Sequence, residues 1–239
     1  MQNCVCHAPL SQALGGTRGY MAAGTEITII VCLVGAVALV VAESRDWPIG
    51  RAIFKIIASS AFVVIAVQLN GTEFLYGRLI LAALALSLVG DILLLSRQSR
   101  LFILGLASFL MSHIAFSMAF AHRPLSDSAL VIGLAIMSCV GLTVLLWLWG
   151  HLRGLYRVAV TAYVVAIVAM CSLAIAVSAA SGTWLLAAGA LAFAASDISV
   201  ARDRFVAPGF TNRAWGLPLY YAAQISLALS VGGARISAA

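Results

Sequence analysis

Two carboxylic acids stand inside stretches of the sequence that are otherwise apolar. Asp91 lies in "LVGDILLL" and Asp197 lies in "AASDISVA". Each is about four residues from the end of its apolar run, which is about 6 Å at the rise of an α-helix. A charge at that depth in a membrane costs on the order of 2 kcal/mol or more, so such residues normally face the interior of a helix bundle and serve a function.

The two aspartates also share a depth, because their helices are expected to run in the same direction. If the two helices are neighbours, the carboxyls form a pair in which one keeps its proton while the other ionises. Such a pair supplies a general acid beside a base or charge stabiliser. Arg202 and Arg204 follow Asp197 closely. We therefore expect Asp197 to be the ionised member and Asp91 to be the acid.

Further polar residues are placed to support these carboxyls. They are Lys55, His113, Ser196, Tyr220, Tyr221 and Gln224 in the apolar runs, and Arg204 at the end that carries the aspartates. Each also has a structural interpretation. A lysine near a span end can snorkel to the interface, a lone histidine can bond a neighbouring helix, and Tyr221 can belong to an interfacial aromatic belt. Arg204, with Arg97, Arg100 and Arg202, either binds a lipid phosphate or fixes the topology.

Composition places these residues in a membrane protein. Of 239 residues, 63% are hydrophobic and 9% are charged, with a mean hydropathy of +1.08. Soluble domains carry about 25% charged residues. The net charge of +6 is typical of basic loops on the cytoplasmic side and does not indicate a nucleic-acid partner. The four histidines show no metal-ligand spacing and no GxSxG elbow is present, so we expect no metal or other cofactor and no serine nucleophile.

The apolar runs predict an all-α, polytopic bundle of about eight transmembrane helices, each close to the ~20 residues that a span needs. The expected spans are Glu26–Ala42, Arg51–Leu69, Gly77–Leu95, Leu101–Ala121, Asp127–Gly150, Leu155–Ala179, Thr183–Ala201 and Ala214–Ala234. They form one domain over residues 26–234, between a flexible N-terminal tail (1–25) and a short C-terminal tail (235–239). The N-terminal tail carries Cys4, Cys6 and His7, which are metal-binding or redox-active types, but no second ligand cluster accompanies them.

Basic residues predict the orientation. Of the fourteen Lys and Arg residues, ten fall on the side where the two aspartates lie, so the positive-inside rule places that side in the cytoplasm and both termini outside. We expect a bacterial inner membrane. An internal echo between "ALSLVGDILLLSRQSRLF" and "ALAFAASDISVARDRF" further predicts two parallel four-helix halves, related by an axis along the membrane normal.

Three segments carry a family resemblance. The first contains Gly90, Asp91, Phe102, Gly105, Leu106, Phe109 and His113, the second Ser196, Asp197, Ala201 and Phe205, and the third runs from Pro218 to Gln224. In this order they resemble the YhhN-like lysoplasmalogenases, over roughly Arg51 to Val231. The resemblance implies a membrane hydrolase that acts on an ether bond, with Asp91 and Asp197 as its catalytic residues. In that family the basic residue of the second helix is often followed by Pro, whereas Ile56 follows Lys55 here.

The resemblance also implies a substrate, a lysophospholipid with a vinyl ether bond, and two products, a fatty aldehyde and glycerophosphocholine or glycerophosphoethanolamine. A vinyl ether is stable to base and labile to acid, so its hydrolysis needs a proton donor for carbon and an anion near the resulting cation. A carboxyl pair provides both, as in two-carboxylate glycosidases. Two alternatives remain open: a proton-coupled transporter of small molecules, and a hydrolase of another lipid ether or ester. Headgroup preference and oligomeric state are not determined by the sequence.

Overall fold

The computed structural model describes residues 24–96 and 98–236, with side chains to residue 233. Over these residues the chain forms eight α-helices and no strand, which confirms the all-α prediction. The helices are α2 (Thr25–Ser44), α3 (Pro48–Gln68), α4 (Leu75–Leu93), α5 (Ser99–Ala121), α6 (Asp127–Trp149), α7 (Leu155–Ser181), α8 (Leu185–Ala201) and α9 (Phe210–Ile236), with the π-helical turn η1 (Arg202–Val206) after α8. The predictions about Cys4, Cys6, His7 and Arg97 fall outside the described residues.

Seven of these helices are long and apolar enough to cross a membrane, which makes the chain a multi-pass membrane protein. The exception is α9, predicted as a span over Ala214–Ala234. Tyr220, Tyr221 and Gln224 lower its hydropathy, yet all three side chains are buried. Polar residues are tolerated at membrane depth when they face the interior of a bundle, and α9 packs against α2, α3, α4 and α8.

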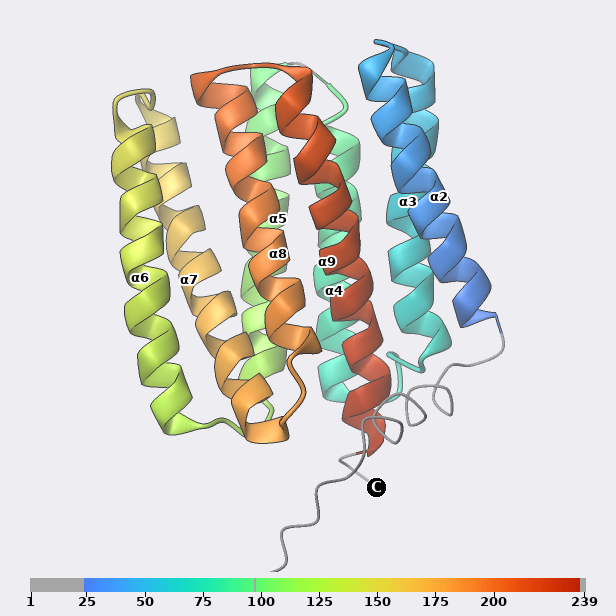
Figure 1. Cartoon of the computed structure of the whole chain (residues 1–239), viewed down its shortest axis with the longest axis vertical. Coiled ribbons are helices and arrows are strands. Elements are labelled where there is room, and N and C mark those ends of the chain that lie inside the picture. Colours follow the sequence, from blue (N-terminus) through green and yellow to red (C-terminus); the bar gives the residue numbers. More distant parts are fainter. Residues whose placement is uncertain (1–23, 97, 237–239) are drawn as a thin grey trace, which may run out of the picture.

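Consecutive helices run antiparallel through the bundle (Figure 1). The main packed pairs are α2 with α3, α4 with α5, α6 with α7, and α8 with α9. Further contacts join α5 to α7 and α3 to α9. The helix α6 lies at the edge of the bundle, beside α7 (Figure 1). The aspartate-bearing helices α4 and α8 make at most marginal contact with each other, whereas α9 packs on both.

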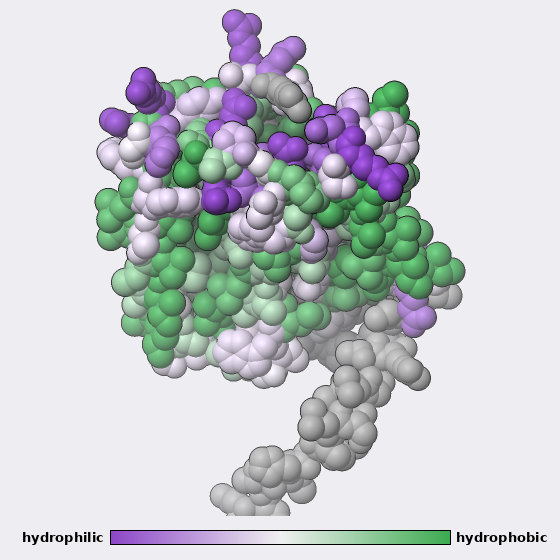
Figure 2. All heavy atoms as spheres, turned by 45° about the horizontal axis from the view of Figure 1, so that its top comes forward, coloured by the Kyte–Doolittle hydropathy of each residue, from purple (hydrophilic) through white to green (hydrophobic). Residues whose placement is uncertain are grey.

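Charged side chains gather at one end of the bundle. Figure 2 shows hydrophilic residues over the end that lies at the top of Figure 1, above an apolar belt. At this end α4 and α8 finish and α3, α5 and α9 begin. The distribution matches the clustering of basic residues predicted from the sequence. The side of the membrane that this end faces stays a prediction.

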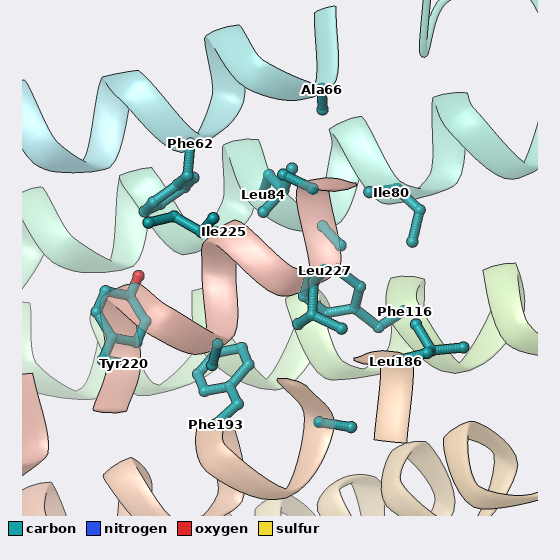
Figure 3. Close-up of a cluster of buried hydrophobic side chains, with 14 of the residues drawn as sticks. Phe62, Ala66, Ile80, Leu84, Phe116, Leu186, Phe193, Tyr220, Ile225 and Leu227 are labelled. Carbon is teal, nitrogen blue, oxygen red and sulfur yellow. The ribbon is translucent and has the colours of Figure 1, made fainter. Parts of the chain in front are cut away.

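Aromatic and aliphatic side chains fill the bundle below that end. Figure 3 shows Phe62 of α3, Phe193 of α8 and Tyr220 of α9 turned toward a shared core. The Tyr220 ring lies 5.5 Å from the Phe193 ring and 6.2 Å from the Phe62 ring, centroid to centroid, in edge-to-face contacts. Such contacts are worth about 0.5–1.5 kcal/mol each beyond their buried area. They hold α9 in register with both neighbours.

Close packing between α4 and α5 fixes the position of Asp91. A side chain at Gly90 would place its Cβ 2.6 Å from the Phe109 ring, so only glycine lets the two helices approach this closely. Ser87 and Ser112 share a hydrogen bond of 2.8 Å across the same interface. Small residues and serine bonds of this kind are the usual means of joining helices in lipid.

Candidate active site

Asp91 is a buried carboxyl with three donors around it. The Lys55 Nζ lies 3.1 Å from its Oδ1. The hydroxyls of Ser59 and Tyr220 donate to its Oδ2 over 2.6 and 2.7 Å. Since all three groups are donors, they complement an ionised carboxylate, which only accepts. Tyr221 extends the network, with its hydroxyl 3.2 Å from that of Ser59.

Asp197 has a different set of partners. The fully buried His113 places its Nε2 3.2 Å from the Asp197 Oδ2, within ion-pair distance, although the two atoms are not aligned for a hydrogen bond. Tyr163 of α7 lines the same cavity walls as this carboxyl. No described arginine pairs with Asp197: Arg202 bonds Asn212 instead, and Arg204 bonds Ser99.

The second ring nitrogen determines how many protons the His113–Asp197 pair holds. The Nδ1 of His113 lies 2.6 Å from the carbonyl oxygen of Phe109. A carbonyl only accepts, so Nδ1 carries a hydrogen. In the neutral ring Nε2 is then bare, and it would repel an ionised Asp197. The pair is therefore stable with one proton besides that on Nδ1, held either as a carboxylic acid beside imidazole or as a carboxylate beside imidazolium.

Both aspartates line one cavity of about 480 Å³. It extends from Asp91 and Asp197 to the charged end of the bundle. Its wall also includes Lys55, Ser196, Tyr163, Tyr220 and Phe109. The two carboxyls share this cavity, but no hydrogen bond between them is present. The predicted pair is thus two separately partnered carboxyls facing one space.

A network of ion pairs surrounds the mouth of the cavity. Arg213 at the start of α9 bonds Glu43 of α2 at 2.9 Å and Asp203 of η1 at 3.3 Å, and Arg51 of α3 lies 3.5 Å from Glu43. Arg204 also lines the cavity. Its guanidinium stacks over the Phe102 ring at 4.3 Å and has no acidic partner among the described residues. The Arg204 guanidinium at the mouth can therefore pair with an anion in the cavity.

The other predicted residues are placed less directly. Ser196 lines the cavity, but its hydroxyl donates to the Phe193 carbonyl in its own helix. Tyr221 is fully buried, so its interpretation as part of an interfacial belt is wrong. Gln224 is buried one turn beyond Tyr220 and does not line the cavity.

The sequence analysis missed several residues of this site. Ser59 follows Lys55 by four positions, and residues at that spacing share a helix face, so it could have been found from Lys55. Tyr163 in "TAYVV" carries a hydroxyl that must find a partner inside an apolar helix. Glu43 and Asp203 stand near span ends, where charged residues are usually solvated. They belong instead to the network at the cavity mouth, which no sequence pattern indicates.

Each aspartate takes partners from both halves of the chain. Asp91 of α4 contacts α3 in its own half and α9 in the other. Asp197 of α8 contacts α7 in its own half and α5 in the other. If the halves are α2–α5 and α6–α9, then α3 and α7 are the second helices of their halves, and α5 and α9 are the fourth. The two carboxyls therefore have neighbouring helices at equivalent positions, which supply different side chains. This equivalence supports the predicted two-half arrangement, which stays a prediction.

Tyr220→Phe tests the Asp91 contacts. Removing the hydroxyl takes away one charge-assisted hydrogen bond, worth about 1.5–3 kcal/mol. We expect turnover of the substrate proposed below to fall by roughly tenfold or more, measured as kcat on purified protein. Tyr76→Phe is the matched control, because the Tyr76 hydroxyl bonds Ser230 at 2.7 Å and does not line the cavity. Equal activity in both variants would contradict a role for the Tyr220 hydroxyl.

Comparison with known proteins agrees with the site. The YhhN family matches the chain over residues 50–231, which contain both aspartates and every residue that contacts them. The chain belongs to the YhhN family. Among curated proteins, Lysoplasmalogenase TMEM86A of Bos taurus is 34% identical over 65% of this chain and 66% of its own length. Lysoplasmalogenase TMEM86A of Homo sapiens is 35% identical over the same shares.

A bacterial relative is also similar. Lysoplasmalogenase of Mycobacterium tuberculosis is 32% identical over 60% of this chain and 55% of its own length. The chain therefore spans slightly less than two thirds of the length of the mammalian relatives and about half of the mycobacterial one. No solved structure matches this YhhN chain.

Proposed function

We propose that this protein hydrolyses the vinyl ether bond of lysoplasmalogens, releasing a fatty aldehyde and a glycerophospho-alcohol such as glycerophosphocholine or glycerophosphoethanolamine. The observation that carries the proposal is the shared cavity with two carboxyls in opposite settings. Asp91 is surrounded by a cation and two hydroxyl donors, and Asp197 lies 3.2 Å from the His113 imidazole. The names of the curated relatives support the same substrate class.

We assign Asp197 as the proton donor and Asp91 as the fixed anion, the reverse of the roles expected from the sequence. The sequence expectation depended on Arg202 and Arg204, which are bonded elsewhere. Lys55 supplies its charge to Asp91 instead. A single proton on the His113–Asp197 pair is available to a substrate in the cavity, because Asp197 lines the cavity wall.

The reaction then needs no group beyond these side chains and water. Asp197 protonates the β-carbon of the vinyl ether, and the alkene electrons form the new C–H bond, leaving an oxocarbenium ion. Asp91 stabilises this cation and orients a water molecule through the lone pair that its three donors leave on Oδ1. Water adds to the α-carbon and returns a proton to the His113–Asp197 pair. The hemiacetal then collapses: its hydroxyl proton passes to the glycerol oxygen as the C–O bond to that oxygen breaks, which gives aldehyde and alcohol.

The lipid phosphate would lie at the mouth of the cavity, where Arg204 carries a guanidinium without an acidic partner among the described residues. Arginine suits phosphate because its fork of donors matches the phosphate oxygens. By the positive-inside rule we place this mouth on the cytoplasmic side of the cell membrane, with both termini outside.

The depth of the site disfavours a transporter. Asp91 and Asp197 lie near the ends of α4 and α8, and their cavity reaches the charged end. Substrate and proton sites of secondary transporters lie near the middle of the membrane. A hydrolase that works at the headgroup level fits this position better.

Purified protein in lipid nanodiscs tests the proposal with a choline lysoplasmalogen. Release of fatty aldehyde, with no release from the matching saturated alkyl ether, is the expected result. The saturated ether is the control because it has no double bond to protonate. Well-folded protein that releases no aldehyde from either choline or ethanolamine lysoplasmalogen would contradict the proposed function.

A further inference from the structure

A second, apolar cavity adjoins the first at Asp197. Its volume is about 70 Å³, and it lies between α5, α6, α7, α8 and η1. Five residues line both cavities: Phe102, Leu106, Tyr163, Asp197 and Val200. Asp91 and Lys55 line only the larger cavity. A molecule that occupies both cavities therefore passes Asp197.

The walls of this side cavity suit a hydrocarbon chain. Apart from Asp197 and Tyr163, every described residue that lines it is apolar. The residues that belong to the side cavity alone are Val144, Leu148, Val160, Val164, Ile167, Ala194, Ile198, Ala201 and Phe205. Burying each methylene group of a ligand against such a wall contributes about 0.8 kcal/mol.

The side cavity also faces the lipid. The helix α6 packs extensively on α7 but makes at most marginal contact with α5 and α8, and it is the least buried of the seven apolar helices. Ile198, Ala201 and Phe205 on the opposite wall are partly exposed. Ala201 and Phe205 pack with the buried Leu148 of α6, so apolar side chains of α6, α8 and η1 lie between the side cavity and the hydrocarbon of the bilayer, and a chain passes there by displacing them.

We infer that the side cavity is the binding subsite for the alkenyl chain of the substrate, which leaves the active site sideways between α6 and α8. The inference rests on the proposed function and adds the orientation of the lipid. A volume of about 70 Å³ is roughly that of two water molecules in the liquid. It holds only the first methylene groups, and the rest of the chain continues into the bilayer.

This orientation explains which carboxyl meets which carbon. In a vinyl ether the β-carbon bears the chain and the α-carbon bears the oxygen. With the chain in the side cavity, the β-carbon lies at the boundary between the cavities, beside Asp197. The glycerol oxygen and the phosphate then extend into the larger cavity, toward Asp91 and Arg204. Proton transfer to carbon from Asp197 follows from this placement.

Ala201→Phe tests the chain subsite, because a phenyl ring there fills the side cavity without changing the larger one. The probe is a radiolabelled, uncleavable hexadecyl ether of lysophosphatidylcholine, bound to protein in nanodiscs. We expect roughly tenfold weaker binding, equal to the loss of one or two buried methylene groups. Glycerophosphocholine has no chain, so its inhibition of aldehyde release should be the same in the variant and in the wild type. Ala188→Phe is the matched control, since Ala188 is exposed on the same helix and lines neither cavity.

A second variant covers the case in which Ala201→Phe does not fold. Val164→Ala removes two methyl groups from the side-cavity wall, and we expect several-fold weaker binding of the hexadecyl ether. Unchanged binding in the folded variants would overturn the inference. Because the ether is not cleaved, this result is independent of turnover. A wild-type protein that binds the ether in this way but releases no aldehyde from lysoplasmalogen would contradict the proposed function alone.

Discussion

Replacing Asp197 by asparagine is expected to lower kcat for aldehyde release by about 10²–10⁴, the usual contribution of a general acid. The amide cannot donate a proton to carbon. His113 faces the side chain at position 197 and does not line the cavity, so it cannot replace the missing donor. Because the donor is absent at every pH, lowering the pH should not restore the rate. Steady-state turnover of a choline lysoplasmalogen between pH 5 and 8 measures this.

The control for Asp197→Asn is Asp127→Asn. Asp127 lies in the first turn of α6, at the end of the bundle away from the cavity, so this variant makes the same substitution without touching the site. It should retain wild-type turnover. Substantial activity in Asp197→Asn, together with an unchanged pH profile, would rule out Asp197 as the proton donor.

Asp91→Asn should both abolish turnover and destabilise the protein. The substitution leaves the Lys55 ammonium without its counter-ion at a site where its side chain is 14% exposed. Breaking a buried ion pair by removing one partner costs about 3 kcal/mol or more. We expect a clearly lower midpoint of thermal unfolding in nanodiscs and kcat reduced by at least the factor predicted for Tyr220→Phe.

The double variant Lys55→Met/Asp91→Asn separates the two effects of Asp91→Asn. Removing both charges together is often neutral for stability, so the thermal midpoint should return toward that of the wild type. Turnover should stay absent, because the anion in the cavity is still missing. A double variant that regains activity would show that Asp91 matters only for stability.

The helices could be predicted from the sequence, and the two aspartates could be selected as candidates, because both inferences depend on local patterns. Apolar runs of about 20 residues predict membrane helices, and a carboxyl within such a run is costly enough to mark a site. The last helix was predicted as a span despite its polar residues, and the structure shows those residues buried inside the bundle.

The roles of the two aspartates could not be predicted in the same way. They depend on which helix packs beside which, and the arginines that follow Asp197 in the sequence bond Asn212 and Ser99 instead. The lysine that pairs with Asp91 comes from α3, and the histidine beside Asp197 comes from α5. Neither contact leaves a local signal. Glu43 and Arg213, 170 positions apart in the chain, meet for the same reason.

The sharing of partners between the two halves has a consequence for biosynthesis. Asp91 takes its Tyr220 bond from the last helix, and Asp197 takes its contact with His113 from the first half of the chain. Neither half, inserted into a bilayer alone, can complete either carboxyl site. Asp197 can meet its partners on α5 and α7 before the last helix is made, whereas Asp91 stays incompletely partnered until α9 has left the ribosome and packed between α4 and α8. A chain stopped before α9 carries exposed polar groups in its lipid-embedded core, which is a feature that membrane quality-control proteases can detect.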